Sequence, residues 1–413
     1  MSNLSSYNLN TTSTSNGRVT STIGKRVAVD SLFLPIQQSV AVNVKTETLI
    51  VNSSTAPMWG SSHTFNLCEK GIALNDITLK LELPPLSGTN LVATYVPGQY
   101  MIDHINILYN GQIVDTLWAD DLFLKMQLYS LDCDRLTSNM GSGLYSSSAQ
   151  RLANISSQTT SNIVLVPLRC FVNSIHPNIL VDSHNIQLTV YMNTQVNSLD
   201  VTSGTLTQNN NIISSTLICK IVRLPVNEVA VRLKTMAQMK KFDNIFHSTI
   251  VSNFVAQAGV TSSTFVLSNL MNANVAQFYF VVRTSKVGSN LFNFSKIASL
   301  NILDGSSNSL CGGAPLPSSY LANIVNRDLT SSSYNSETSF GTNNQNANVY
   351  IHSFSGDIIT ALQTGACLGH RRMQGTEQIV ISYTSTLTQQ VYIDVYAQCQ
   401  SILQMSLSSV LKA

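Results

Sequence analysis

The sequence predicts an all-β protein made of two domains, and three observations lead to this expectation. Short stretches alternate between apolar and polar residues, as half-buried strands do. The chain has 413 residues, more than the roughly 250 to 300 at which a single hydrophobic core stops growing. Similar strand-like segments also recur in the same order at nearly equal separations, which indicates a duplicated unit.

The alternation is clearest at 77–83, 186–192 and 391–397, where every second residue is apolar. Further strands are expected at 46–52, 102–109, 162–169, 216–224, 245–255, 276–283, 296–303 and 378–384. Stretches rich in Asn, Gly, Ser and Pro separate these segments. Many short strands joined by polar connections are typical of a β-sandwich or β-barrel.

Two segments have helical spacing instead. The first follows a hairpin-like turn at 109–112 and has Asp115 or Thr116 as a cap, with acidic residues early, where the helix dipole favours them. Its apolar stripe is Trp118, Leu122, Met126 and Tyr129. The second follows Pro225, and its stripe is Val226, Val229, Ala230, Leu233 and Met236, with Glu228 early and Lys240 and Lys241 beyond its end.

The internal repeat divides the chain. Segment 102–108 resembles 297–303, which lies 195 residues later, and segment 185–191 resembles 390–396, which lies 205 residues later. The predicted organisation is a flexible arm at 1–26, a β domain at 27–225, a linker helix at 226–240, a second β domain at 241–401 and a tail at 402–413. The tail is apolar on one side of a possible helix, which could dock on a neighbour or on an inner partner.

The amino-acid composition limits the classes of function that are expected. Charged residues are only 11%, against about 25% in ordinary globular proteins, and the formal net charge is +2. Specific nucleic-acid binding is therefore not expected, whereas a low-charge surface suits packing against further copies. The sequence has no signal-peptide or membrane-span pattern, and its seven cysteines form no C-x-x-C pair. A protein kept in the cytoplasm or nucleus, with reduced and mostly buried thiols, is expected.

Four passages, in this order, resemble a known family. They are Lys70–Ile77 leading to Leu83-Pro84, Met101–Asp115 (MIDHINILYNGQIVD), Val166–Phe171 leading through Pro177 and Leu180 to the 186–192 strand, and Ile221–Leu224 followed by Asn227-Glu228. Together they are similar to the double jelly-roll major capsid proteins of eukaryotic double-stranded DNA viruses, the large nucleocytoplasmic and polinton-like group. Asn110 in place of a glycine, the reduced aromatic content at Cys170-Phe171 and the short chain depart from that pattern, and they bear on the virus group more than on the fold.

The resemblance implies two consecutive eight-stranded antiparallel jelly rolls, with short inserted helices, at 27–225 and 241–401. It further implies a homotrimer that forms pseudo-hexagonal capsomers and tiles an icosahedral virion shell. Neighbouring capsomers, minor capsid proteins and penton proteins are the expected partners, and an inner membrane or inner-layer protein is an additional possible contact. The alternatives are a receptor- or carbohydrate-binding β-sandwich of the fibre or lectin type and, third, a β-sandwich glycoside hydrolase.

We expect no enzyme activity, no cofactor and no metal site. The polar clusters Asp103-His104, Asp120-Asp121 and Gly369–Arg372 are better explained by an edge pair, a helix dipole and a subunit contact. Cys311 has no His or Asp beside it in the sequence that would activate a thiol, so a turn is expected there. Stretches 130–160, 194–215 and 330–348 are predicted to be surface loops, some of them on the outward face of a capsomer.

Overall fold

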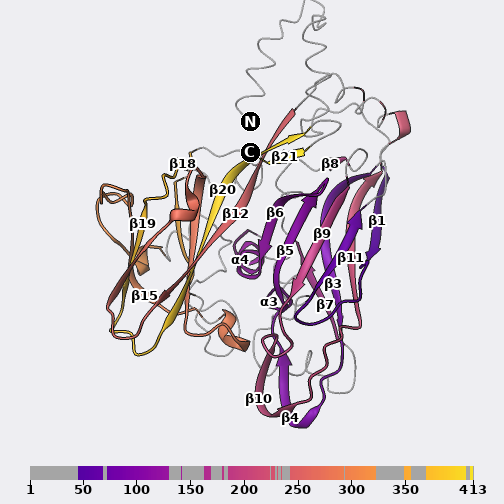
Figure 1. Ribbon diagram of the computed structural model, residues 1–413, viewed down its shortest axis with the longest axis horizontal. Coiled ribbons are helices and arrows are strands. Elements are labelled where there is room, and N and C mark those ends of the chain that lie inside the picture. The colour runs from indigo at the N-terminus through magenta and orange to yellow at the C-terminus, as the bar shows by residue number, and fades with distance from the viewer. Residues whose placement is uncertain are drawn as a thin grey trace, which may run out of the picture.

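The computed structural model contains two β-barrels that lie side by side (Figure 1). The residues that it describes are 45–67, 72–129, 141, 162–168, 179–180, 185–223, 225–227, 230, 234, 242–292, 294–321, 348–354, 369–405 and 410–412. The expected arm at 1–26 and nearly all of the expected loops at 130–160 and 330–348 lie outside these residues. The helices in the described ranges are all too short or too polar to span a membrane.

The first barrel is an eight-stranded antiparallel jelly roll. Its strands are β1 (Lys45–Asn52), β2 (Ser62–Leu67), β3 (Ile72–Leu83), β5 (Ile102–Tyr109), β6 (Gln112–Trp118), β7 (Asn162–Pro167), β9 (Ile186–Met192) and β11 (Ser214–Arg223). They form two sheets in the orders β1-β11-β3-β7 and β2-β9-β5-β6. Additional elements are α3 (Gly98–Met101), α4 (Ala119–Tyr129), β8 (Ile179–Leu180), and a projecting ribbon of β4 (Gly88–Tyr95) and β10 (Leu199–Leu206) (Figure 1).

The second barrel repeats this topology. Its strands are β12 (Phe242–Ala256), β13 (Ser262–Val266), β14 (Asn274–Arg283), β15 (Ile297–Leu303), β16 (Leu316–Pro317), β17 (Tyr350–Ser353), β19 (Gln378–Tyr383) and β20 (Val391–Met405). The sheet orders are β12-β20-β14-β17 and β13-β19-β15-β16, and the short strands β18 (Arg371–Arg372) and β21 (Val410–Lys412) pair with β14 and β20. The short helices η2 (Ser268–Leu270) and η3 (Gly288–Phe292) complete the described elements.

The two barrels share one strand order. When the eight strands of each barrel are counted along the chain, both have one sheet in the order first, eighth, third, sixth and another in the order second, seventh, fourth, fifth. This confirms the predicted duplication and the predicted fold of two consecutive jelly rolls.

The two sequence matches behind that prediction fare differently. The match of 102–108 with 297–303 pairs β5 with β15, which are equivalent strands. The match of 185–191 with 390–396 is wrong, because it pairs β9 with β20, whereas the equivalent of β9 is β19. The core pairs agree with this correction, since Ile105 lies opposite Val190 and Leu300 lies opposite Ile381. Any two amphipathic strands share an alternating pattern, so the pattern alone did not distinguish β19 from β20.

Local structure near α4 is partly as predicted. The predicted cap at Asp115 or Thr116 is wrong, and Trp118 is not part of the helix, because these residues belong to β6, which continues its pairing with β5 as far as Trp118. Asn110 and Gly111 have φ values of 51° and 82°, the left-handed values that a two-residue hairpin turn requires, and they join β5 to β6. The helix α4 begins directly after β6, with Asp120 and Asp121 in its first turn. In the expected linker, Val226, Asn227, Ala230 and Lys234 are helical, and the other residues of 226–240 lie outside the described ones.

Two other expectations need correction. Segment 194–215 is not only loop, because it contains β10, which pairs with β4, although most of β10 is exposed. The tail is not helical where it is described. Strand β20 pairs with β12 as far as Met405, beyond the expected domain end at 401, and β21 then folds back on β20. The long partner β12 explains the extension, since each further residue of β20 satisfies its backbone groups on it.

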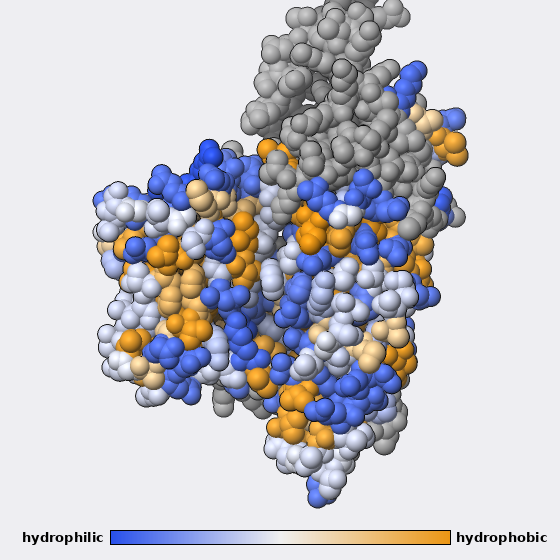
Figure 2. Space-filling model, in the orientation of Figure 1, coloured by the Kyte–Doolittle hydropathy of each residue, from blue (hydrophilic) through white to orange (hydrophobic). Residues whose placement is uncertain are grey.

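The apolar core extends from one barrel to the other. Phe278, Phe280 and Val282 of β14 belong to the core of the second barrel, while Tyr279 and Val281 belong to the apolar cluster of the first. The strand is therefore buried on both faces, and the barrels share an apolar junction. On the visible surface, apolar and hydrophilic residues are interspersed over both barrels (Figure 2).

Candidate functional site

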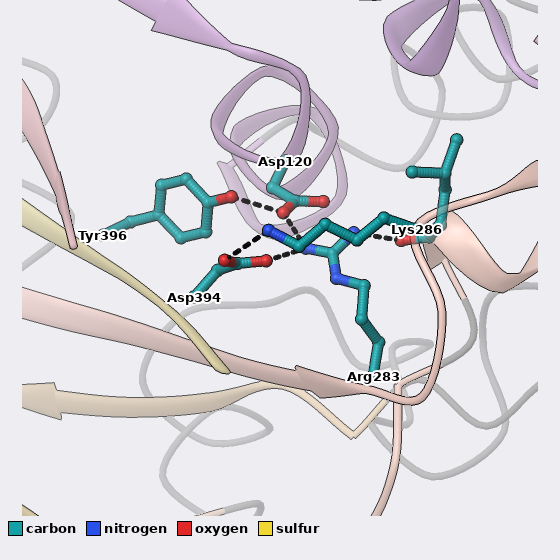
Figure 3. Close-up of polar contacts among 6 residues, drawn as sticks. Asp120, Arg283, Lys286, Asp394 and Tyr396 are labelled. Carbon is teal, nitrogen blue, oxygen red and sulfur yellow. Dashed lines mark hydrogen bonds and ion pairs between the residues drawn. The ribbon is translucent and has the colours of Figure 1, made fainter. Parts of the chain in front are cut away.

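A buried group of charged residues lies at the junction of the two barrels (Figure 3). Arg283 is the last residue of β14, Asp394 lies on β20 and Asp120 lies in the first turn of α4. Their exposed fractions are 2%, 1% and 3%. Nη2 of Arg283 is 2.9 Å from Oδ2 of Asp394 and also donates to Oδ2 of Asp120, while Nη1 donates to the backbone carbonyl of Leu291. One guanidinium thus bridges the barrels.

Two further side chains complete this group, which we call the junction cluster: Asp120, Arg283, Lys286, Asp394 and Tyr396. The Tyr396 hydroxyl donates to Oδ2 of Asp120. Nζ of Lys286 is 2.8 Å from Oδ1 of Asp394 and lies over the ring of Tyr392. Lys286 is 39% exposed, so it forms the solvent edge of an otherwise buried cluster. Two carboxylates face two cations, which balances the buried charge.

Burial and charge set the protonation of the cluster. Burial lowers the pKa of Arg283, but the carboxylates of Asp120 and Asp394 more than offset this, so its pKa is raised and the guanidinium stays charged. Burial, together with Asp120 and Asp394, raises the pKa of Tyr396 well above its ordinary value. Tyr396 therefore stays a protonated donor, and the cluster keeps one hydrogen-bond pattern around neutral pH.

The chemistry of the cluster is that of a structural joint. A cleft of about 280 Å³ opens beside it, and its walls come from both barrels. The acidic and basic groups of the cluster already pair with one another. Among the described residues no group of three or more His, Cys, Asp or Glu side chains is arranged to hold a metal ion. The cluster can fix how one barrel is oriented on the other.

Sequence reasoning missed most of this site. Asp120 was assigned to the helix dipole, and the structure adds its main role, which is to accept bonds from Arg283 and Tyr396 of the second barrel. Arg283 and Asp394 were not singled out. The signal that could have found them is a charged residue within or directly after an unbroken apolar run, as in the segment FYFVVR that ends β14. Such a strand is buried on both faces, so its charge needs a buried partner.

The other predicted polar pairs lie elsewhere. Nδ1 of His104 is 2.7 Å from Oδ2 of Asp103, and the His104 ring stacks on Tyr191 at 4.2 Å between centroids. The two residues pair as expected, but not at a sheet edge, because β5 lies between β9 and β6. Asp121 is fully buried in the first turn of α4. Arg372, on β18, donates a hydrogen bond to Oδ1 of Asn272, in the turn before β14, at 3.1 Å. The subunit contact predicted for 369–372 stays a prediction.

Cys311 does have a histidine neighbour, contrary to expectation. Its sulfur is 4.0 Å from Nδ1 of His352, which the topology brings in from β17. Burial raises the pKa of the Cys311 thiol, and it lowers the pKa of His352 to about 4. Both groups are therefore neutral at neutral pH, and the pair does not generate a thiolate. Among the described cysteines, Cys219, Cys311 and Cys399 are unbridged.

Comparison with known proteins identifies the fold. No protein-family model and no curated protein sequence matches this chain. The solved structure of VP54 from the virus PBCV-1, fitted into a reconstruction of the virophage Sputnik, matches with a TM-score of 0.68 and 13% identity over 91% of this chain and 98% of that one. A quasi-atomic model of the PBCV-1 virus capsid matches with a TM-score of 0.65 and 14% identity, over 91% and 98% of the two chains. The Faustovirus major capsid protein matches with a TM-score of 0.61 and 10% identity, over 94% of each chain.

These matches cover both barrels and nearly the whole length of the other proteins. The chain therefore has the fold of the Faustovirus major capsid protein and of the PBCV-1 capsid, built as two consecutive jelly rolls.

Proposed function

We propose that this chain is the major capsid protein of a double-stranded DNA virus, and that three copies form a pseudo-hexagonal capsomer that tiles an icosahedral shell. The observation that carries this proposal is the pair of barrels with one strand order, held side by side in the fold that solved viral capsid proteins have. A chain with two equivalent barrels can supply six equivalent units from three copies. Six units around a threefold axis give a nearly hexagonal outline.

The junction supports this role mechanically. A capsomer keeps its outline only if the two barrels of a chain do not turn relative to each other. The apolar junction on β14 and the bridging guanidinium of Arg283 together oppose such rotation. A buried charged cluster also penalises other orientations of the barrels, because they would leave its charges unpaired. The work of the protein is thus done by shape and contact area, and we propose no enzymatic role.

The surface supports a shell protein more than a carbohydrate-binding one. Carbohydrate sites usually present several aromatic faces in loops, and Tyr320 is the large aromatic side chain that is most exposed among the described residues. Most of the described aromatic residues fill the cores instead, as Tyr95, Phe123 and Phe280 do. We infer that the main partners are further copies of the chain, with minor capsid and penton proteins at special positions of the virion shell, assembled in the host cytoplasm or nucleus.

Light scattering and negative-stain imaging of the purified full chain test the proposal. We expect a particle of three times the chain mass of 44.9 kDa, with a hexagonal outline in projection. A permanent contact of this kind should bury more than about 2,000 Å² in total. A chain that remains monomeric at every concentration, and forms no shells when expressed in cells, would contradict the proposed function.

A further inference from the structure

The cleft beside the junction cluster has one wall from each barrel. On the second barrel, Val251 and Asn253 of β12 lie opposite Tyr396 and Asp394 of β20, and all four residues line the cleft. Val251 and Tyr396 pack with the apolar cluster of the first barrel, whereas Asn253 is exposed. The cleft therefore begins where the packed interface between the barrels ends.

The wall from the first barrel carries an indole ring that its neighbours hold in place. Trp118 ends β6 and lies opposite His104 of β5, which in turn lies opposite Tyr191 of β9. The ring centroids of Trp118 and His104 are 5.2 Å apart, and those of His104 and Tyr191 are 4.2 Å apart. Trp118 is half-buried, so part of its ring is packed and part borders the cleft. This row of rings limits the rotation of Trp118 and gives the cleft an ordered apolar surface.

Three carboxamides line the same cleft. Asn193 and Asn197 come from the turn after β9, and Asn253 comes from β12 of the other barrel. The turn is fixed, because the backbone N–H of Asn193 donates to the Met101 carbonyl and its Nδ2 donates to the Tyr100 carbonyl, both at 2.9 Å. Among the described residues, none forms a hydrogen bond with the side chains of Asn197 and Asn253. Each of these two carboxamides offers a donor group and an acceptor oxygen to a ligand.

The charges that line the cleft favour a neutral ligand. They are Asp103, Asp120, Asp394, Arg283 and Lys286, of which all but Asp103 belong to the junction cluster and pair with one another. Asp103 adds one negative charge, and its side chain is 55% exposed. An anion in the cleft would meet this carboxylate, and a cation would meet the partly exposed ammonium group of Lys286, which Figure 3 shows at the edge of the cluster.

We propose that the cleft binds a neutral hexose, with the sugar ring on Trp118 and its hydroxyl groups on the carboxamides of Asn197 and Asn253. A sugar ring has an apolar C–H face that packs on an aromatic face, and its hydroxyl groups donate and accept hydrogen bonds as carboxamides do. The volume of about 280 Å³ equals that of roughly nine water molecules at about 30 Å³ each, which leaves room for a ligand of this size. Such a ligand would contact both barrels of one chain.

The affinity of this site for a sugar should be low. One aromatic face is fewer than carbohydrate-binding proteins usually present, and two carboxamides supply few hydrogen bonds. We expect a dissociation constant on the order of 1 mM. The inference stands apart from the proposed function, because it concerns a site within a single chain.

Tryptophan fluorescence of the purified full chain tests the proposal, because the sequence has only two tryptophans. Trp59 is 5% exposed and lies outside the cleft lining, so a sugar-dependent change in emission reports on Trp118. The probes are glucose, galactose and mannose, each raised to about 50 mM, roughly fifty times the expected dissociation constant. We expect a saturable change with at least one of them, and its loss in Trp118→Phe. Absence of binding by all three, in fluorescence and in saturation-transfer NMR, would overturn the proposal.

Amide variants show whether the cleft itself binds the sugar. The double variant Asn197→Ala, Asn253→Ala keeps Trp118 as the reporter and should raise the dissociation constant about tenfold, because two hydrogen bonds are lost. Asn211→Ala is the matched control, since Asn211 is an exposed asparagine that does not line the cleft, and it should bind as the wild type does. Circular dichroism and the thermal midpoint should be unchanged in all variants. An unchanged affinity in the folded double variant would contradict the site.

Charged sugars test the class of ligand. The uronate and the hexosamine of the hexose that binds best add a carboxylate or an ammonium group to nearly the same ring. We expect both to bind more weakly than the neutral hexose, and Asp103→Asn to reduce the difference for the uronate. Tighter binding of either charged sugar would overturn the assignment to a neutral ligand. Light scattering of the same samples reports the oligomeric state separately, so failure of this site is distinguishable from failure of the capsid proposal.

Discussion

Arg283 on the second barrel donates a hydrogen bond to Asp120 on the first barrel, across 163 positions of the sequence. Both side chains are almost completely buried. The contact makes the orientation of the barrels part of the folded state of the chain. Two jelly rolls joined only by a linker would not keep a fixed orientation relative to each other.

Replacing Arg283 should destabilise the chain strongly. In Arg283→Met the apolar stem is kept and the charge is lost, which leaves the Asp120 and Asp394 carboxylates buried without their shared cation. Breaking a buried pair in this way costs about 3–5 kcal/mol. Urea unfolding monitored by circular dichroism measures the change in the free energy of unfolding.

The matched control for that variant is Arg372→Met, which removes an arginine from the exposed strand β18 and should change stability by less than about 0.5 kcal/mol. The triple variant Asp120→Asn, Arg283→Met, Asp394→Asn should recover part of the loss, because it removes the unpaired charges. If Arg283→Met were as stable as the wild type, the junction cluster would not hold the barrels together.

Gly204 should tolerate no side chain. Its φ is +84°, and a Cβ built there would lie 2.2 Å from the carbonyl oxygen of Asn90 on the paired strand β4. Gly204→Ala should cost about 1–2 kcal/mol for the left-handed backbone and a further 1–3 kcal/mol, roughly, for displacing β4. Gly259→Ala is the control, because Gly259 has a φ of +89° with nothing within 4 Å of the added atom. Thermal unfolding of the two variants gives the comparison, and equal midpoints would show that the ribbon can open at no cost.

The fold could be predicted from the sequence because its signals are local. The alternation in strands such as β3 and β9 comes from one buried and one exposed face, and the turn at Asn110-Gly111 needs residues that accept positive φ. Strands β4 and β10 were missed because most of β10 and the first three residues of β4 are exposed, so neither strand has apolar alternation along its whole length. That β19 is the equivalent of β9 in the second barrel follows only from the order of the strands in the sheets, and no single sequence segment contains that order.

The site was much less predictable for a related reason. Asp120 has a sufficient local explanation in the first turn of α4, and nothing near it in the sequence indicates a partner on β14. Contacts between barrels depend on which outward residues face each other after both barrels have folded. The proximity of His352 to Cys311 was missed in the same way, since the two residues come from different parts of the second barrel.

Removing the N-terminal segment should separate folding from assembly. The first described strand begins at Lys45, and all the described strands of both barrels lie between residues 45 and 412. Deleting residues 2–24 should therefore leave the thermal midpoint and the trimer nearly unchanged, while particle formation in cells falls sharply. Misfolding of the truncated chain, or shell formation at the wild-type yield, would contradict the prediction that this segment acts in assembly and not in folding.

His63 should make the first barrel sensitive to acid. The ring is fully buried in the barrel core, with Nε2 2.8 Å from the Ser215 hydroxyl, and burial lowers its pKa from 6.5 to about 4. Between these two pH values the unfolded chain binds a proton at His63 that the folded chain does not bind. The contribution of His63 to the free energy of unfolding is therefore fully present above pH 6.5 and is lost as the pH falls toward 4. The loss from this residue is on the order of 3 kcal/mol, since one pKa unit corresponds to about 1.4 kcal/mol.

Urea unfolding at pH 7, 6, 5 and 4.5 should show a shallower decline for His63→Gln than for the wild type, while His370→Gln, at an exposed position, should follow the wild-type curve. Parallel curves for His63→Gln and the wild type would show that the acid sensitivity arises elsewhere in the chain.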